Sequence, residues 1–264
     1  MLIPIHSIDD DRVAIFRELK ERELAARSGL FIAEGEHVVR RLLGSRFEVH
    51  SVLLAQRRVA EIAPLVPDHV PAYAVPNELV HQIVGFKFHS GILAAGKRPP
   101  RASIDDVVPR DRERLTLVIC PEIATTDNLG SLIRLSAGFG VEAMIIGERS
   151  CDPFFRQSVR VSMGTIFRLP IVQSEDIARD LRRLRDEWRV DLAAAVLDDD
   201  AEPLSRASRA PRLGLLFGNE AQGLHREHVD LCQRRVTIPM KLGTDSLNVA
   251  VACGIFLYHF TREA

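Results

Sequence analysis

The feature that most constrains the fold of this chain is a regular alternation of apolar and helical segments in its C-terminal half. Apolar runs of strand length recur there: LTLVIC, EAMIIG, DLAAAVL, RLGLLFG and RRVTIPM. Helical patterns such as NLGSLIRLSAGFG and SEDIARDLRRLRDEW lie between them. Strands that are apolar on both faces and alternate with helices are typical of a parallel sheet covered on both sides. The pattern predicts an α/β domain with ligands at the carboxyl ends of its strands.

A smaller α/β domain is predicted in the N-terminal part. The apolar runs LFIAEG, EVHSVLLA and GILAAG alternate there with helical stretches such as EHVVRRLLGS. A helical pattern over residues 10–29 precedes them and ends on Gly29, which suits a helix C-terminus. The stretch GKRPPRASIDDVVPRDRER is Pro-rich, charged and without apolar periodicity, as in a linker. We therefore predict a first domain at 1–96, a linker at 97–113 and a second domain at 114–264.

Composition places few limits on function. With 35 basic and 36 acidic residues the net charge is −1, so a nucleic-acid partner must be argued from local features. The four cysteines are far apart, without a C-x-x-C pair or His at metal-ligand spacing. They predict buried thiols in a reducing compartment, and no metal. The N-terminus lacks a secretory pattern, and the longest apolar-rich run, NVAVACGIFLYHF, is too short to span a bilayer. We expect a cytoplasmic protein.

Polar residues that packing does not require follow three of the predicted strands. After LTLVIC, the stretch PEIATTDNLGSLIRLSAGFG carries Asn128 and Arg134 on an otherwise apolar helix. A simpler interpretation is that Asp127 or Asn128 caps the helix and Arg134 lies on a solvated face. In LLFGNEAQGL, Gly218 allows a ligand to approach the backbone. An ordinary turn explains Gly218 well, but explains Glu220 less well.

The third polar cluster lies in IPMKLGTDSLNVAVACG. Gly243 supplies a turn, and Thr244, Asp245 or Ser246 could cap the helix that follows. Capping does not account for Asn248 in this interpretation. Three polar turns at three strand ends are less easily explained as coincidence than any one of them. None contains a P-loop, a dinucleotide fingerprint or a hydrolase elbow, so a nucleotide-like cofactor would not use a Gly-rich first turn.

Together these clusters resemble the SpoU (TrmH-type) family of RNA 2′-O-ribose methyltransferases in the SPOUT superfamily. The likeness covers about residues 114 to 262. The residues that match the three family motifs are, in order, Asn128, Gly130 and Arg134; Gly218, Asn219, Glu220 and Gly223; and Pro239, Ser246, Leu247 and Asn248. Two N-terminal stretches, FIAEGEHVVRRLL and HSGILAAG, resemble the L30e-like RNA substrate-binding domain that many family members carry.

The resemblance implies a parallel-sheet SPOUT domain with a deep trefoil knot, which general topological rules would not predict. It also implies a homodimer, because two chains complete the active site in this family. The small-residue helix NVAVACG suits such an interface, although ordinary core packing explains it equally well. S-adenosylmethionine is the implied cofactor, held against the main chain at Gly218, Ile238, Met240 and Leu247.

The implied catalytic residues are Arg134, Asn128, Glu220, Ser246 and Asn248. Arg134 is often proposed as the base in this family, but an arginine pKa above ~12 makes a free guanidine rare. A charged Arg134 that binds phosphate or stabilises the forming alkoxide is the alternative. Asn128 would then orient Arg134 or the ribose, and Glu220 would hold its loop or steer the sulfonium.

An RNA substrate is implied, with ribosomal RNA favoured and transfer RNA as the alternative. A non-catalytic RNA-binding relative and an unrelated small-molecule α/β enzyme are further hypotheses. The intact motif residues argue against the first of these, and the second lacks a motif of its own. Local basic residues that could contact RNA phosphates are Arg40, Arg41, Arg57, Arg58, Arg156, Arg160 and Arg168.

Overall fold

The computed structural model covers the whole chain and describes all residues except 18–27, 86–87, 242–245 and 263–264. Much of the helix predicted over 10–29 therefore lies outside the described residues. The predicted turn at Gly243 and the predicted caps Thr244 and Asp245 lie outside them as well.

The chain divides into two compact units. The first unit comprises Met1–Pro100 and Pro153–Phe167, and the second comprises Arg101–Asp152 and Arg168–Ala264. The division differs from the predicted domain boundaries at two places. Most of the predicted linker packs in the second unit, and a segment from the middle of the predicted second domain packs in the first.

The first unit contains a five-stranded mixed sheet in the order β1-β4-β3-β5-β2. Strands β1, β4 and β3 are parallel, while β5 runs antiparallel to both β3 and β2. The three strands predicted from apolar runs are confirmed as β2, β3 and β5, whereas β1 and β4 were not predicted. The strand bounds are β1 (Leu2–Pro4), β2 (Leu30–Glu34), β3 (Val49–Ala55), β4 (Ala72–Val75) and β5 (Ile92–Lys97).

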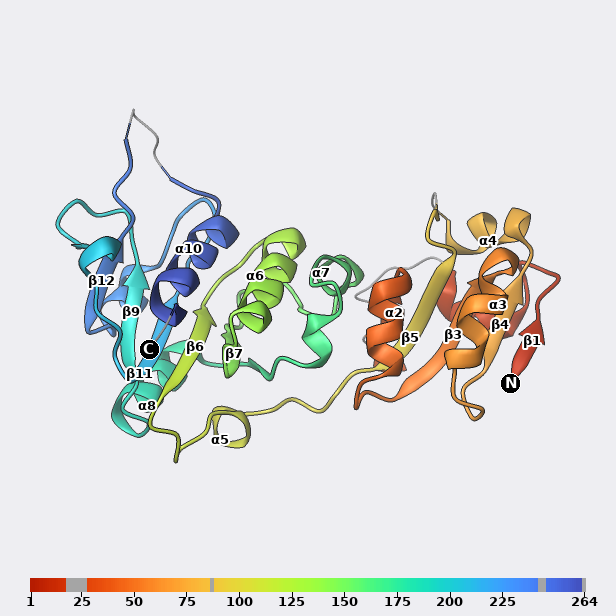
Figure 1. Ribbon diagram of the computed structural model, residues 1–264, viewed down its shortest axis with the longest axis horizontal. Helices are drawn as coiled ribbons and strands as arrows, with labels where there is room; N and C mark the ends of the chain where they lie inside the picture. Colours follow the sequence, from red (N-terminus) through yellow and green to blue (C-terminus); the bar gives the residue numbers. More distant parts are fainter. Residues whose placement is uncertain (18–27, 86–87, 242–245, 263–264) are drawn as a thin grey trace. The chain divides into compact units, whose positions relative to one another are not determined.

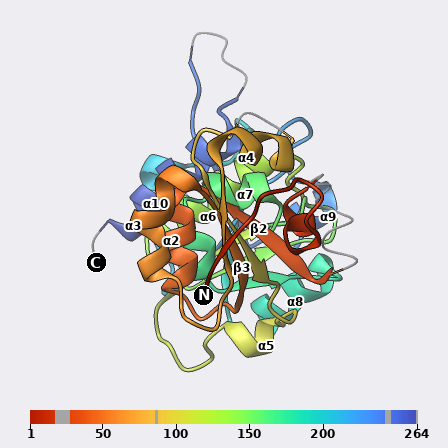
Figure 2. The ribbon, with the colours of Figure 1, turned by 90° about the vertical axis from the view of Figure 1, so that its right-hand side faces the viewer.

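Helices cover both faces of this sheet. A core formed by one face of the strands packs against η1 and α4, and α2 contacts β2 and β5. Figure 2 shows α2 and α3 together on one side of β2 and β3. The helix bounds are η1 (Asp11–Phe16), α2 (Glu36–Leu43), η2 (Gln56–Arg58), α3 (Val59–Ile62), η3 (Ala63–Leu65), α4 (Asn77–Val84), α7 (Arg156–Val161) and η4 (Thr165–Phe167).

The predicted continuous helix over 10–29 is wrong at its beginning. Residues of η1 form a 3-10 helix, and Arg17 directly after it is extended, with φ −86° and ψ 147°. Val13 and Phe16 are the buried residues of this turn, and their spacing of three suits 3-10 geometry, in which residues i and i+3 share a face.

The segment Pro153–Phe167 joins the first unit through an aromatic cluster. The ring of Phe31 lies 5.2 Å from that of Phe154 and 5.7 Å from that of Phe167, centroid to centroid. A Cβ at Gly96 would lie 2.5 Å from the Phe31 ring, so the absence of a side chain there makes room for the cluster. Arg156 Nη1 also donates to Glu34 Oε2 at 2.6 Å. These contacts connect residues that are more than 120 positions apart in sequence.

The second unit contains a seven-stranded parallel sheet in the order β10-β12-β9-β11-β6-β7-β8. The predicted parallel α/β architecture is confirmed, and each of the five predicted apolar runs contains a strand. The bounds are β6 (Leu115–Cys120), β7 (Ala143–Ile146), β8 (Ile171–Gln173), β9 (Asp191–Ala195), β10 (Glu202–Pro203), β11 (Arg212–Leu216) and β12 (Arg234–Thr237).

Two groups of helices cover this sheet. Helices α6 (Thr126–Gly138) and α10 (Val249–Thr261) contact each other, and both lie in front of the strands in Figure 1. A core on the opposite face includes residues of α5 (Ile104–Val107) and α8 (Ile177–Asp186). The short α9 (Arg226–Val229) follows β11, and η5 (Leu204–Arg206) follows β10. No helix among the described residues is both long and apolar enough to cross a membrane.

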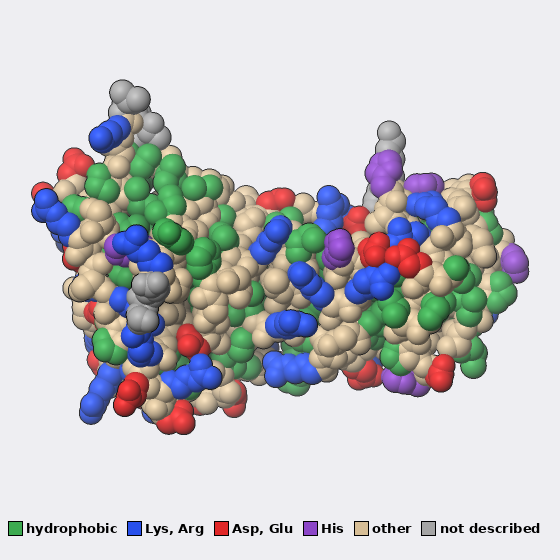
Figure 3. Space-filling model, in the orientation of Figure 1, with side chains coloured by type: hydrophobic (Ala, Val, Ile, Leu, Met, Phe, Trp, Pro, Cys, Tyr) green, Lys and Arg blue, Asp and Glu red, His purple; other side chains and the backbone are tan. Residues whose placement is uncertain are grey.

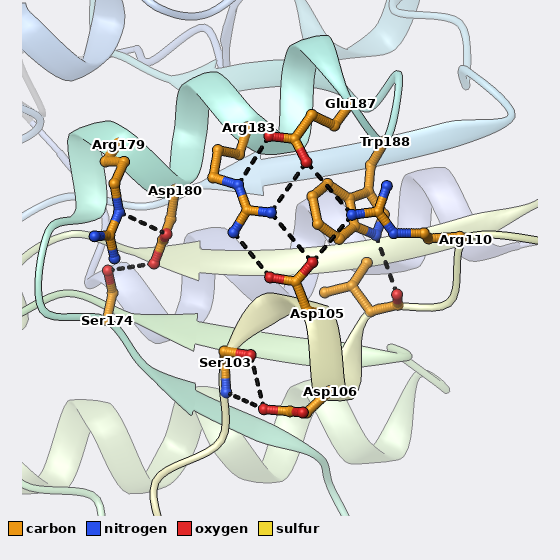
Figure 4. Close-up of polar contacts among 11 residues, drawn as sticks. Ser103, Asp105, Asp106, Arg110, Ser174, Arg179, Asp180, Arg183, Glu187 and Trp188 are labelled. Carbon is orange, nitrogen blue, oxygen red and sulfur yellow. Dashed lines mark hydrogen bonds and ion pairs between the residues drawn. The ribbon is translucent and has the colours of Figure 1, made fainter.

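The predicted linker contains a helix and a side-chain network that attach it to α8 (Figure 4). Ser103 and Asp106 form a capping box, which starts α5. Asp105 accepts hydrogen bonds from Arg183 at 2.9 and 3.1 Å, and Arg110 lies 3.7 Å above the Trp188 ring. The guanidinium of Arg183, followed by that of Arg110, holds the pKa of Asp105 below its usual value. The stretch therefore has structure that its lack of apolar periodicity did not predict.

Candidate active site

A pocket of about 400 Å³ lies at the carboxyl ends of β9, β11 and β12 in the second unit. All four predicted cofactor-binding residues line it: Gly218, Ile238, Met240 and Leu247. Glu220, Ser246 and Asn248 line it as well. Sequence reasoning did not identify Phe217, Val196 or Phe256, which also line it. These are apolar residues whose pattern is that of ordinary core.

The loop after β11 is closed tightly on itself. Asn219 and Gly223 exchange two backbone hydrogen bonds of 2.9 Å, and Asn219 Oδ1 accepts from the backbone N–H groups of Ala221 and Gln222 at 2.9 and 3.2 Å. A Cβ at Gly218 would lie 2.3 Å from Gly223 backbone atoms. A side chain at Gly218 would therefore force the loop open, so this glycine is required by close backbone approach.

Glu220 connects this loop to the loop that follows β6. Its Oε1 accepts from Asn128 Nδ2 and Thr125 Oγ1, both at 2.8 Å, and its Oε2 accepts from the backbone N–H of Ala124 at 3.1 Å. Partial burial by itself raises the pKa of the Glu220 carboxyl. The hydrogen bonds, with that of Asn128 the largest, outweigh burial and leave the pKa below its usual value. Glu220 is therefore held as a carboxylate.

Asn248 brings the third motif to the same cluster. Its Nδ2 donates to Asn128 Oδ1 at 2.9 Å, so Asn128 bridges Glu220 and Asn248. Its Oδ1 accepts from the backbone N–H groups of Ala250 and Val251 at 2.9 and 3.4 Å, which makes it the N-cap of α10. The expectation that capping would not account for Asn248 is wrong. This one amide caps the helix and contacts Asn128 simultaneously.

Thr125 caps α6. Its side chain accepts from the backbone N–H of Asn128 at 3.4 Å, so the interpretation that Asp127 or Asn128 caps this helix is wrong. The hydroxyl of Thr125 also donates to Glu220. The cap therefore places Asn128 on the first turn, with its amide free for the two side-chain contacts described above.

Arg134 lies on α6 but is not among the residues that line the pocket. Its side chain is exposed and has no hydrogen bond or ion pair with the part of the chain that the structure describes. No hydrogen bond joins Asn128 to Arg134 among the described residues; the amide of Asn128 contacts Glu220 and Asn248 instead. The structure thus brings together Asn128, Glu220 and Asn248, whereas Arg134 forms no hydrogen bond or ion pair with them.

Most of the arginines predicted to contact RNA have partners within the first unit. Glu36, for example, accepts from both Arg40 and Arg58, and the pKa of its carboxyl is lowered to about 2, first by Arg58 and then by Arg40. Arg168, in the second unit, is exposed. The six engaged residues are Arg40, Arg41, Arg57, Arg58, Arg156 and Arg160.

The cysteines are unpaired, and none is highly exposed. Cys120 and Cys253 are buried, while Cys151 and Cys232 are partly buried. Burial raises the pKa of Cys151 and of Cys232 to about 12, so both are thiols near neutral pH. Within the described ranges, no group of three or more His, Cys, Asp and Glu side chains is placed to hold a metal ion.

A doubly covered parallel sheet with a polar pocket at its carboxyl edge defines an α/β protein that binds a small ligand at its strand ends. The chain belongs to the SpoU rRNA Methylase family, whose model matches residues 115–258. The predicted family and the predicted methyltransferase class are thereby confirmed. The trefoil knot and the roles of the individual site residues remain predictions.

Related proteins extend over both units. An uncharacterized tRNA/rRNA methyltransferase from Mycobacterium bovis is 35% identical over 97% of this chain and 90% of its own length. A 23S rRNA (guanosine-2′-O-)-methyltransferase from Acinetobacter baylyi is 25% identical, covering 78% of this chain and 84% of the relative. The fold matches that of an AdoMet-bound rRNA methyltransferase from Sinorhizobium meliloti, with a TM-score of 0.82, 24% identity and coverage of 99% and 98%.

Proposed function

We propose that this protein transfers the methyl group of S-adenosylmethionine to a ribose 2′-hydroxyl of RNA, and that its substrate is ribosomal RNA. The observation that carries the proposal is the chain of contacts from Glu220 through Asn128 to Asn248. It joins the three sequence motifs at the rim of one pocket. If these three side chains served only to cap helices or close turns, they would not need to contact one another.

The pocket suits S-adenosylmethionine in size and chemistry. Its volume of about 400 Å³ is in the usual range for small-molecule sites, ~300–1,000 Å³. Apolar side chains, among them Ile238, Met240 and Leu247, line it together with Gly218 and Gly223, which offer only backbone atoms. Such backbone N–H and C=O groups can bind adenine edges without charged side chains. The carboxylate of Glu220 offers a negative charge at the rim, and the bound cofactor would supply an electrophilic methyl group.

Arg134 acts as a charged residue in this proposal. Its guanidinium is exposed and carries no ion pair with described residues, so it remains available to the RNA. A guanidinium is almost always protonated, which disfavours its use as a base. It would bind a phosphate or stabilise the negative charge that develops on the ribose oxygen. Asn128 and Ser246 would orient the ribose by hydrogen bonds.

The first unit is proposed to bind the RNA substrate, as an L30e-like domain. Its arginines are largely paired with carboxylates, so recognition by shape and backbone contacts suits it better than a free basic patch. The exposed Arg168 of the second unit adds one cationic contact. Ribosomal RNA is favoured because the Acinetobacter baylyi relative is named for it, with transfer RNA as the alternative. Four unpaired cysteines suit a reducing cytoplasm.

We further propose that the protein functions as a homodimer through α10. Val251, Ile255 and Tyr258 are 51%, 40% and 60% exposed and share one face of this helix. Figure 3 shows hydrophobic side chains gathered over the region of α10. An apolar face at the spacing i, i+4 and i+7 is typical of a helix that packs against a partner. The same helix begins at Asn248, so a second chain on this face would lie close to the pocket.

Two measurements test the proposed function. Calorimetry should detect S-adenosylmethionine binding, and mapping of 2′-O-methyl sites in total RNA should show one site lost when the gene is deleted. Absence of binding at millimolar cofactor would contradict the methyltransferase proposal. A lost site in transfer RNA would replace the ribosomal substrate by the alternative. Ile255→Arg should convert the dimer to a monomer in light scattering; a wild-type monomer would contradict the dimer proposal.

A further inference from the structure

Glu122 is a partly buried carboxylate that the proposed mechanism does not use. It lies two residues after the end of β6, in the stretch PEIATT, and its side chain is only 22% exposed. It does not line the pocket. A carboxylate in such a position is costly to desolvate unless its oxygens accept hydrogen bonds. Its partners therefore indicate what it does.

The two oxygens of Glu122 contact the two ends of the pocket loop. Oε1 accepts from Asn219 Nδ2 at 3.1 Å, and Oε2 lies 3.2 Å from His225 Nε2. Because a carboxylate only accepts, Nε2 of His225 carries the proton in this contact. Asn219 begins the tight part of the loop, and His225 is the N-cap residue of α9, where the loop ends. One side chain thus fixes both ends.

The contact with Asn219 also determines the orientation of its amide. With Nδ2 donating to Glu122, Oδ1 is turned toward the loop, where it accepts from Ala221 and Gln222. A flipped amide would place its NH2 group against those two N–H groups and lose both bonds. Residues 218–223 all line the pocket, so the shape of the ligand-binding backbone depends on this orientation.

Glu122 and Glu220 join the same two loops in opposite directions. Glu220, from the loop after β11, reaches Ala124 and Thr125 in the loop after β6. Glu122, from the loop after β6, reaches the loop after β11. A Cβ at Gly147, in the loop after β7, would lie 2.2 Å from Pro121 O, so the residue before Glu122 is itself closely packed. Glu122 therefore extends from a rigid position.

From this geometry we propose that Glu122 is a positioning residue for S-adenosylmethionine, acting through Asn219 and His225 on the backbone of the pocket loop. The inference rests on the proposed function, because the ligand is its cofactor. The role of Glu122 depends on hydrogen bonding to Asn219 and His225: its carboxylate does not itself line the pocket and, in this proposal, does not contact the RNA.

Glu122→Ala should weaken S-adenosylmethionine binding about tenfold, since it removes hydrogen bonds to a charged acceptor. The turnover number at saturating cofactor should change less than about twofold. Glu122→Gln should restore binding, because its carbonyl can accept from Asn219 and its NH2 group can donate to the other tautomer of His225. Hydrogen exchange of the amides of residues 219–224 should be faster in the Ala variant and near normal in the Gln variant.

Glu227→Ala is the matched control: its side chain is 59% exposed and lies 3.7 Å from His228, next to the same loop end. It should bind cofactor as the wild type does. Normal affinity in Glu122→Ala, or equal losses in the Ala and Gln variants, would overturn the positioning role while leaving the methyltransferase function intact. A wild type that binds no S-adenosylmethionine would overturn both.

Discussion

Buried or partly buried carboxylates occur in both units, but they have different partners. In the first unit Glu34 and Glu36 accept from arginines: Glu34 from Arg156, and Glu36 from Arg40 and Arg58. At the pocket of the second unit, Glu220 accepts from backbone N–H groups, a hydroxyl and an amide. The carboxylates of the first unit are neutralised by neighbouring charges. Glu220 keeps its negative charge.

This difference in partners indicates different roles: the carboxylates of the first unit stabilise packing, whereas Glu220 is available for function. An ion pair that joins two segments fixes their packing and leaves little charge for a ligand. Neutral donors fix a loop equally well while the carboxylate remains charged. Arg134, on the same helix as Asn128, carries no ion pair with described residues and stays exposed. The second unit thus retains a negative group that lines the pocket, Glu220, and an exposed positive group outside the pocket lining, Arg134.

The largest effect is expected at Arg134. Arg134→Ala should reduce methyl transfer by at least about 100-fold, because it removes the positive charge proposed to stabilise the ribose oxygen. The pocket loops do not contact Arg134, so S-adenosylmethionine affinity and the unfolding midpoint should be unchanged. Arg134→Lys keeps the charge and tests whether guanidinium geometry matters. Steady-state methylation and calorimetry measure both quantities, and near-normal turnover in the Ala variant would remove Arg134 from the mechanism.

The next effect concerns the first unit and should appear in stability alone. Arg156→Ala leaves Glu34, a strand residue only 8% exposed, without its 2.6 Å partner. The free energy of unfolding should fall by about 1–3 kcal/mol in urea titrations, since a buried carboxylate that loses its closest hydrogen-bond donor is unfavourable. Cofactor affinity should not change.

Arg160→Ala provides the control for that experiment. Arg160 lies 3.6 Å from the same carboxylate, but its side chain is 54% exposed. Its removal should cost no more than about 0.5 kcal/mol. Equal losses in the two variants would mean that net charge, and not the buried pair, stabilises this segment.

The apolar runs were sufficient to predict the sheet of the second unit. Strands β6 and β7 are buried along their whole length, so their consecutive residues are apolar and can be recognised in the sequence. The short edge strands were not predictable in this way: β10 comprises two residues, Glu202–Pro203, whose pairing with β12 depends on a neighbour far along the chain. The packing of Phe154 and Phe167 on Phe31 has the same origin.

At the site, the family motifs identified Asn128, Glu220 and Asn248 but not how they contact one another. Asn248 was expected to lie inside the helix, because three earlier residues could also have capped it. Asn248, the residue that caps α10, also contacts Asn128 on another helix. The local sequence around α10 does not encode that contact. Glu122 had a signal that was available, a charged residue two positions after a buried strand, but its partner His225 lies 103 positions away.

A smaller effect is expected at Asn248, where two substitutions separate its two contacts. Asn248→Ala should lower the free energy of unfolding by about 1 kcal/mol, because it removes the cap of α10. Asn248→Ser retains a capping oxygen but not the Nδ2 that donates to Asn128. Both should reduce methylation roughly fivefold to tenfold, while only Ala should change stability. Normal activity in the Ser variant would mean that Asn248 acts as a cap alone.

The smallest effect is a dependence of cofactor affinity on pH, which tests whether Glu220 acts as a charged group. The pKa of Glu220 is lower in the folded protein than its usual value. Its ionised form therefore stabilises the loop contacts above the ordinary glutamate pKa of ~4.3. That contribution is lost as pH falls through the still lower folded value. Cofactor affinity of the wild type should thus be independent of this group from pH 7 to 5 and decrease only under more acidic conditions.

Glu220→Gln is the variant that makes this dependence visible. A glutamine amide cannot accept at both positions now used by Ala124 and Asn128, so its cofactor affinity should already be weaker at pH 7. It should lack the acidic decrease, because it carries no titrating group at this position. Calorimetry of both proteins at several pH values gives the comparison. If the cofactor affinity of the variant decreases equally at low pH, the decrease is caused by other carboxylates. The charge of Glu220 would then not be required for the contacts that hold the loop.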